Sequence, residues 1–161
     1  MGIGTLMLPL VRRSGATPFY NIDGYAAYDN NTHSEYVQII RNGVVELYST
    51  QFFFPKEIQS GKYVDCISGE HIYQNILESI ANSLKVMSPF NIEEPYLISV
   101  YFHNMKDIRF CMQDGTMRLV NYSSNPFPFV TLPTNNSDLK TALQPLFDIL
   151  WQCAGCARCH L

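Results

Sequence analysis

The segment from Tyr36 to Ser49, which reads YVQIIR-NG-VVELYS, constrains the fold more than any other part of the chain. Both halves are rich in the β-branched and aromatic residues that are typical of strands. Asn and Gly tolerate the positive φ that a two-residue type I′ turn requires at both central positions. We therefore predict an antiparallel hairpin with Asn42 and Gly43 as its turn.

A two-residue turn fixes the pairing of this hairpin, with Arg41 opposite Val44 and Ile40 opposite Val45. Each face then carries several apolar side chains, so we expect the hairpin to be covered, at least partly, on both sides. Arg41 and Glu46 lie diagonally on one face, where a partly solvated ion pair of small energetic value is expected. One face holds Tyr36, Gln38, Ile40, Val45 and Leu47, and the other holds Val37, Ile39, Arg41, Val44, Glu46 and Tyr48.

Two segments have the apolar periodicity of helices. Ile72, Ile76, Ile80 and Leu84 recur every fourth residue and predict a helix over 69–86, with Ser68 as N-cap and an end at Ser88-Pro89. A last helix is predicted after Ser137 as N-cap, and Pro145 either kinks it or begins a separate helical turn. The apolar stripe of that helix comprises Leu139, Leu143, Leu146, Phe147, Leu150 and Trp151.

The other elements are predicted to be strands and connections, and the whole 161-residue chain suits a single domain spanning residues 1–161. We expect an α+β fold in which an antiparallel sheet with the central Asn-Gly hairpin packs against two main helices. The predicted strands are Gly4 to Val11, Tyr25 to Tyr28, Gln51 to Pro55, Pro95 to His103 paired with Ile108 to Met112, and Met117 to Tyr122, and the segment from Ser123 to Asn136 is predicted to be a loop.

Composition excludes some function classes. Eleven basic and fourteen acidic residues give a net charge of -3, without the clustered Lys and Arg that grip a phosphate backbone, so this chain by itself is not expected to bind nucleic acid. Five cysteines, three of them in the last nine residues, indicate reduced thiols and a cytoplasmic protein. The apolar start lacks a preceding basic region, so we expect no signal peptide, and no stretch is long enough to span a bilayer.

Three segments together resemble a bacterial family. They are Leu6 to Pro9, the hairpin YVQIIRNGVVE from Tyr36 to Glu46, and the ending LQPLFDILWQCAG from Leu143 to Gly155. They are similar to the region that follows the AlbA-type, Schlafen-like DNA-binding domain in bacterial proteins described as ATP-binding or helix-turn-helix transcriptional regulators. The resemblance covers most of the chain in order, and its motifs are structural.

The resemblance implies an accessory domain with a regulatory, sensing or assembly role. Nucleic-acid or nucleotide chemistry would then belong to an N-terminal domain that is absent from this chain. The family pattern has no fixed cysteine cluster at the position where this sequence reads CAGCARCH, which weakens a general metal role for that segment.

The C-terminal residues Cys153, Cys156, Cys159 and His160 are the one chemically suggestive cluster. Three thiolates and an imidazole are suitable zinc ligands, but zinc sites usually take ligand pairs from separated segments. Packed or frayed thiols near a chain end are the alternative, and our prediction assigns no metal. The C-x-x-C-H pattern of haem attachment also occurs at 156–160, where we take it as accidental.

Cys66 and His71 are close in sequence and are the other candidates for chemistry. A Cys/His nucleophile pair needs the imidazole within hydrogen-bond reach of the sulfur. The alternative is a buried thiol and a histidine at a helix start. Because phosphate-binding loops, nucleophile elbows and paired carboxylates are also missing from the sequence, we predict no catalytic residues and no cofactor. The competing hypothesis is a metal- or thiol-dependent enzyme that uses Cys66 and His71 or the C-terminal cysteines.

The run Phe52-Phe53-Phe54, with Phe127 and Phe129, predicts either core packing or an exposed patch. Consecutive strand residues point to opposite faces, so at least one side of the run needs cover from another element or another chain. We therefore predict a protein partner or self-association, with no membrane and no direct nucleic-acid contact.

Overall fold

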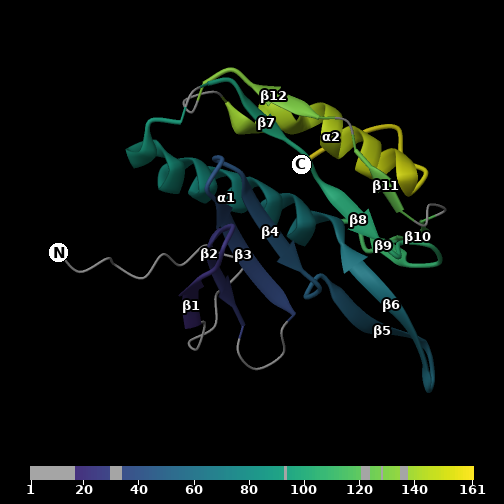
Figure 1. Cartoon of the computed structure of the whole chain (residues 1–161). Coiled ribbons are helices and arrows are strands. Elements are labelled where there is room, and N and C mark those ends of the chain that lie inside the picture. Colours follow the sequence, from purple (N-terminus) through teal and green to yellow (C-terminus); the bar gives the residue numbers. More distant parts are fainter. Residues whose placement is uncertain (1–16, 30–33, 93, 121–123, 128, 135–137) are drawn as a thin grey trace. The chain divides into compact units, whose positions relative to one another are not determined.

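The computed structural model describes residues 17–29, 34–92, 94–120, 124–127, 129–134 and 138–161. The predicted strand from Gly4 to Val11 and the predicted N-cap Ser137 lie outside these residues. The chain forms two compact units: Met1–Gln51 with Asn75–Ile92, and Phe52–Gln74 with Glu93–Leu161. The predicted α+β class, with antiparallel sheets and two main helices, is confirmed (Figure 1).

The elements run in the following order along the chain. They are β1 (Thr17–Tyr20), β2 (Gly24–Tyr28), β3 (Glu35–Ile40), β4 (Val45–Ser49), β5 (Phe53–Gln59), β6 (Lys62–Ser68), α1 (Gly69–Met87), the 3₁₀ turn η2 (Ser88–Phe90), β7 (Tyr96–Ile98), β8 (Tyr101–His103), β9 (Arg109–Cys111), β10 (Met117–Leu119), β11 (Ser124–Pro126), β12 (Val130–Leu132) and α2 (Leu139–Cys153).

The first unit is built on a four-stranded antiparallel sheet with the order β1-β2-β3-β4, whose strands lie side by side in Figure 1. Ala27 and Val37 are buried on one face of this sheet. Val45, Leu47 and, from α1, Val86 pack against them. The later part of α1 therefore covers one face of the sheet, which we call the inner face.

The hairpin is present as β3 and β4, but β4 is the last strand in the described sheet order and the predicted register is wrong by one residue. Ile39 pairs with Val45 and Tyr36 pairs with Tyr48, while the Ile40 N–H donates to the Val44 carbonyl at 2.8 Å. The loop therefore has three residues, 41–43, and the Gly43 N–H closes a turn onto the Ile40 carbonyl. Gly43 alone takes the left-handed conformation, with φ of 88°. This is a three-residue hairpin loop ending in a glycine bulge, not a type I′ turn.

The shift of one residue changes which side chains of β4 share a face with those of β3. Val37 and Leu47 now share the inner face, and Tyr36 and Tyr48 share the opposite, outer face. The predicted membership of the two faces is therefore wrong, because a change of register by one residue moves a whole strand's side chains to the other face. The shift also places Arg41 in the loop, so the expected diagonal arrangement with Glu46 on one face does not arise.

The second unit contains a sheet with the order β10-β9-β6-β5. Its β5–β6 hairpin, which the sequence analysis missed beyond residue 55, turns tightly at Ser60-Gly61 between the paired residues Gln59 and Lys62. Strands β6 and β9 pair in parallel, in contrast to every other pair in the described sheets. This pairing brings Cys66 beside Arg109.

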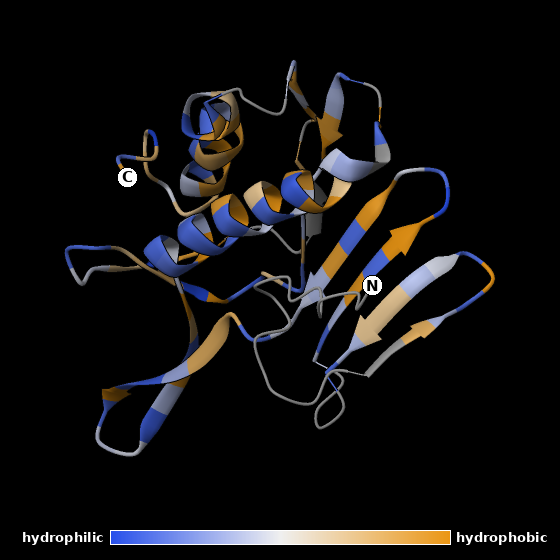
Figure 2. Cartoon of the chain, turned by 90° about the vertical axis from the view of Figure 1, so that its left-hand side faces the viewer, coloured by the Kyte–Doolittle hydropathy of each residue, from blue (hydrophilic) through white to orange (hydrophobic). Residues whose placement is uncertain are grey.

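Helix α1 agrees closely with the sequence prediction. The Ser68 hydroxyl oxygen accepts a hydrogen bond from the His71 N–H at 3.2 Å, which is the predicted N-cap. The helix ends at Met87, and Pro89 lies in the 3₁₀ turn that follows. Hydrophilic and hydrophobic residues alternate along both α1 and α2 in Figure 2, as expected for helices with one buried face.

Helix α2 begins one residue later than the predicted cap would place it. Asp138 is the N-cap, and its carboxylate accepts hydrogen bonds from the Lys140 N–H and the Thr141 hydroxyl. Pro145 lies exposed inside a continuous helix, so a separate second helical turn is not formed. Five of the six predicted stripe residues are buried, namely Leu143, Leu146, Phe147, Leu150 and Trp151.

The core of the second unit joins α2 to the start of α1 and to the sheet. Tyr73 packs on Phe147 with ring centroids 4.5 Å apart, and Phe110 packs edge-on against Trp151 at 5.0 Å. Gly69 begins α1 directly beside this second pair. The absence of a side chain at this position lets the helix start approach the two rings closely.

Two small two-stranded sheets replace part of the predicted connectivity. The segments around β8 and β9 do not pair with each other as predicted, because β8 pairs with β11 and β7 pairs with β12. Both β11 and β12 lie in the segment that was predicted to be a loop. Each is only three residues long, which leaves too little periodicity to identify it from the sequence. Among the described helices, none is both long and apolar enough to cross a membrane.

Candidate functional site

A row of four aromatic rings crosses the outer face of the first sheet. Phe19 stacks on Tyr28 with centroids 5.2 Å apart, Tyr28 meets Tyr36 edge-to-face at 5.8 Å, and Tyr36 stacks on Tyr48 at 5.3 Å. We call these four residues the tyrosine row. It takes one ring from each strand, and at about 4.8 Å per strand step it extends roughly 14 Å across the sheet.

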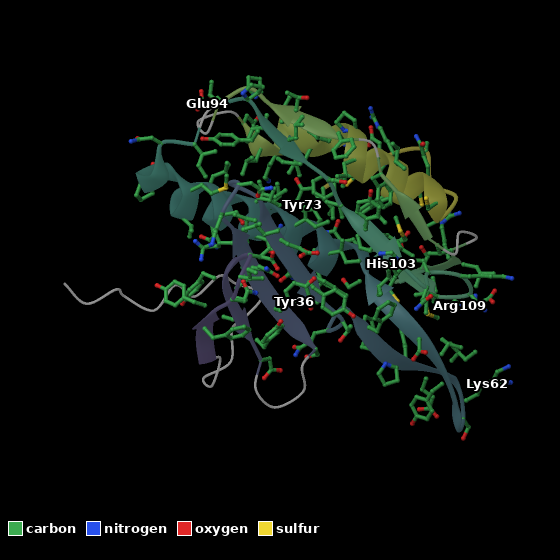
Figure 3. The ribbon with its side chains drawn as sticks, viewed as in Figure 1. Tyr36, Lys62, Tyr73, Glu94, His103 and Arg109 are labelled. Carbon is green, nitrogen blue, oxygen red and sulfur yellow. The ribbon has the colours of Figure 1, made fainter. Side chains whose placement is uncertain are left out.

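Strand register places the four rings in line. Tyr36 pairs directly with Tyr28 on one side and with Tyr48 on the other. Phe19 completes the row diagonally, because Tyr28 pairs with Thr17, two residues before it. Side chains that are directly or diagonally opposed on one face interact across strands, which explains the row's continuity. Figure 3 shows Tyr36 on this sheet.

The orientation of the rings decides what the row can recognise. The interplanar angles are 25° for Phe19 and Tyr28 and 17° for Tyr36 and Tyr48, so these rings turn their faces toward each other. In each stacked pair the two facing sides are therefore covered, which leaves the ring edges for contact with a ligand. Platforms for single-stranded nucleic acid need free ring faces for stacking of the bases. Ring edges with tyrosine hydroxyls instead provide an amphipathic stripe with hydrogen-bonding groups, which is typical of protein-contact surfaces.

The tyrosine row has an acidic neighbour. Glu46 lies diagonal to Tyr36 across the β3–β4 pair, and burial together with this neighbouring carboxylate raises the pKa of Tyr36 to about 12. The hydroxyl therefore stays protonated throughout the physiological pH range. Glu46 is itself exposed. Among the described strand residues of the outer face, Glu46 is the one with a charged side chain. This face is therefore locally negative.

The row remains accessible within its unit. The exposed fraction is 37% for Phe19, 37% for Tyr28 and 43% for Tyr48. Ala26 on the same face is fully buried, so the sheet backbone below the rings is closed to solvent. The accessible surface consists of ring edges and hydroxyls above a rigid four-stranded support.

The phenylalanines for which the sequence left core packing and an exposed patch as alternatives are divided between the two. Phe53 and Phe54 are exposed and point to opposite faces of β5, and Phe129 is 68% exposed. Phe127 is buried and packs edge-on against Phe102 with centroids 5.5 Å apart. A single exposed patch that includes Phe127 is therefore not formed.

Cys66 is buried in the second unit, and its sulfur contacts lie on neighbouring strands. Its Sγ lies 3.8 Å from Met117 Sδ, and Cys111 acts on its thiol from the neighbouring strand β9. Burial and the contact with Cys111 raise the pKa of Cys66 to about 11, while Lys56 and Arg109 act in the opposite direction. His71 instead packs edge-on against Phe52. The structure thus pairs Cys66 with a second thiol and a thioether.

The C-terminal residues do not continue α2. Gly155, with φ of 74°, ends the helix, and the Cys156 N–H donates to the Trp151 carbonyl in a Schellman arrangement. Cys159 is buried and its N–H donates to Asp148, and burial raises the pKa of both Cys159 and Cys153. Within the described residues, which include Cys153, Cys156, Cys159 and His160, no three His, Cys, Asp or Glu side chains gather to hold a metal ion.

Sequence reasoning missed the tyrosine row and the partners of Cys66. Tyr28, Tyr36 and Tyr48 are visible as aromatic strand residues, but the two-residue turn placed Tyr36 and Tyr48 on opposite faces. Cys111 and Met117 come from strands far along the chain from Cys66, so no local motif connects the three.

The chain was compared with protein families, curated proteins and solved structures. No family model matches the sequence, and the comparisons with curated proteins and with solved structures also find no similar protein. The resemblance to the Schlafen-associated accessory domain therefore rests on the quoted segments alone.

Proposed function

We propose that this chain is a non-catalytic regulatory or assembly module that binds a basic protein surface through the tyrosine row. The carrying observation is the accessible line of Phe19, Tyr28, Tyr36 and Tyr48, with its ring edges. Tyrosine is enriched at protein interfaces, where it buries a large area at a low cost in side-chain entropy.

Charge indicates the kind of partner. Glu46 adjoins the row, and the whole chain carries a net charge of -3. A partner that presents arginine among apolar side chains would satisfy both the carboxylate and the ring edges. A DNA-binding domain of the Schlafen-like type would offer such a basic surface. The resemblance therefore favours a cytoplasmic module that acts beside that domain and leaves the nucleic acid to its partner.

Site-specific photo-crosslinking in cells tests the proposal. A benzophenone amino acid at position 48 is expected to capture a basic protein, whereas the same group at Tyr63, which is 61% exposed in the second unit, is not. With the captured protein purified, Tyr48→Ala and Glu46→Lys are each expected to weaken binding roughly tenfold or more. Tyr63→Ala is the matched control and should leave the affinity unchanged.

Three outcomes would contradict the proposal. Equal capture from positions 48 and 63 would show that the row is not a preferred surface. Unchanged affinity of the Tyr48→Ala and Glu46→Lys variants would place the interface elsewhere. Capture of a second copy, with concentration-dependent sedimentation of the purified chain, would identify self-association as the row's role in place of a basic partner.

A further inference from the structure

The sheet of the second unit carries three sulfur atoms close together on one face. Cys66 on β6, Cys111 on β9 and Met117 on β10 come from three adjacent strands. Cys66 Sγ lies 3.8 Å from Met117 Sδ, Met117 is the direct cross-strand partner of Cys111, and Cys111 acts on the Cys66 thiol. We call these three residues the sulfur triangle.

The spacing of the Cys66 and Met117 sulfur atoms suits a metal ion. Metal–thiolate bonds are about 2.3 Å long, so three sulfur atoms in a plane around one ion stand about 4.0 Å apart. The sulfur–sulfur distance of 3.8 Å between Cys66 and Met117 is close to that value.

The ligand types indicate which metal would bind. Zinc is held by thiolate, imidazole and carboxylate, and a thioether is not among its usual ligands. Two thiolates with one thioether are the soft ligands that select monovalent copper. We propose that Cys66, Cys111 and Met117 form a trigonal binding site for Cu(I), which is distinct from the C-terminal cysteines and from the tyrosine row.

The surroundings fit the charge of such a complex. Two thiolates around one monovalent cation carry a net charge of -1, after the two thiol protons have left to the solvent. Arg109 lies directly beside Cys66 on the adjacent parallel strand and is labelled in Figure 3. Lys56 is the second cation that acts on Cys66. These two side chains compensate the remaining negative charge.

Access and shielding are also suitable. Cys66 is fully buried and Cys111 nearly so, whereas Met117 is only half-buried. Met117 is therefore the most accessible of the three residues. Phe54 pairs with Cys66 on β5 and adds an apolar wall. Burial of the two thiols would limit their contact with water.

Competition with a chromophoric Cu(I) chelator under anaerobic, reducing conditions tests the site. The purified chain is expected to take one equivalent of Cu(I) from bicinchoninate. Cys66→Ala and Cys111→Ala should each abolish this uptake, and Met117→Leu should weaken it roughly tenfold or more. Cys156→Ala is the matched control, because Cys156 Sγ lies 3.9 Å from Met112 Sδ in a similar thiol–thioether contact.

A second measurement guards against variants that do not fold. X-ray absorption of the copper-loaded chain is expected to show three sulfur ligands in the wild type and two in Met117→Leu, a substitution of similar volume that a core tolerates. Retention of the bound equivalent in folded Cys66→Ala or Cys111→Ala would overturn the proposal. So would loss of the equivalent in a folded variant whose only changes are alanines at 153, 156 and 159.

Discussion

The start of α1 provides a sharp test of the packing in the second unit. At Gly69, an added Cβ would lie 2.6 Å from Phe110 Cε1, 2.9 Å from Phe110 Cζ and 3.1 Å from Trp151 Cζ2. Favourable carbon–carbon contacts lie near 3.5–4.0 Å. Phe110 is fully buried and Trp151 is 3% exposed, so neither ring has free space to move into. Gly69→Ala must therefore displace packed atoms.

The magnitude follows from two opposing effects. Overpacking a filled core costs about 1–3 kcal/mol. Replacing Gly by Ala in a helix interior gains up to about 1 kcal/mol, and less at the first helical position, where the backbone N–H lacks an intrahelical partner in any case. The clash is larger than the gain, so we expect Gly69→Ala to lower the free energy of unfolding by roughly 1–2 kcal/mol. Urea denaturation followed by tryptophan fluorescence, which reports on Trp151, measures this change.

A double-mutant cycle separates the clash from other causes. Phe110→Leu removes the ring atoms nearest to the new methyl, so the Gly69→Ala/Phe110→Leu pair should be coupled favourably by about 1 kcal/mol. Gly61→Ala is the control: its Cβ meets nothing within 4 Å, and its φ of 74° makes the cost one of backbone strain. Phe110→Leu should not rescue it. A Gly69→Ala chain as stable as the wild type, or a cycle without coupling, would refute the reasoning.

Three further predictions concern the hairpin, a titrating tyrosine and a helix cap. Deletion of Arg41 leaves Asn42-Gly43 as a two-residue turn between the same partners Ile40 and Val44, so the free energy of unfolding should stay within about 1 kcal/mol of the wild-type value. A larger loss in urea denaturation would contradict the observed pairing. Burial and the neighbouring Glu46 carboxylate raise the pKa of Tyr36 from 10.0 to about 12, so its stabilisation is complete below pH 10 and is lost as pH rises toward 12. Tyr36→Phe should therefore flatten alkaline denaturation in that window, and an unchanged profile would contradict the raised pKa. The hydrogen bonds from Thr141 lower the pKa of Asp138 below 3.8, so its stabilisation is present above that pH and is lost as pH falls further. Acid unfolding followed by circular dichroism should therefore be less steep in Asp138→Asn than in the wild type. Equal slopes would contradict a stabilising role for the Asp138 cap.

The helices could be predicted from the sequence because their signals are local. The repeat through Ile72, Ile76 and Leu84 and the Ser68 cap lie within one continuous segment. The same local logic identified the apolar stripe of α2 but chose the neighbouring residue as its cap. Ser and Asp are comparably good N-caps, so residue type alone does not separate position 137 from Asp138.

Pairing between distant strands could not be predicted in the same way. The parallel β6–β9 pair joins segments on either side of α1, and no residue pattern in either strand identifies the strand with which it pairs. The sulfur triangle depends on this contact and on the β9–β10 pair, so Cys66 attracted attention only as a neighbour of His71 in sequence. Its neighbours in space belong to strands whose order follows from the packing of the whole unit.

The hairpin shows how one local choice determines a surface. Asn42-Gly43 is compatible with a two-residue turn, which needs positive φ at both residues, and with a three-residue loop, which needs it only at the glycine. The observed loop takes the second form, and the resulting register places Tyr36 opposite Tyr48. Under the two-residue turn Tyr48 would pair with Val37, the row would end at Tyr36, and the inner face would lose Val45 and Leu47. The arrangement that buries the apolar residues of β4 is thus the same one that completes the tyrosine row, so selection for the core alone would retain the surface that we propose for binding.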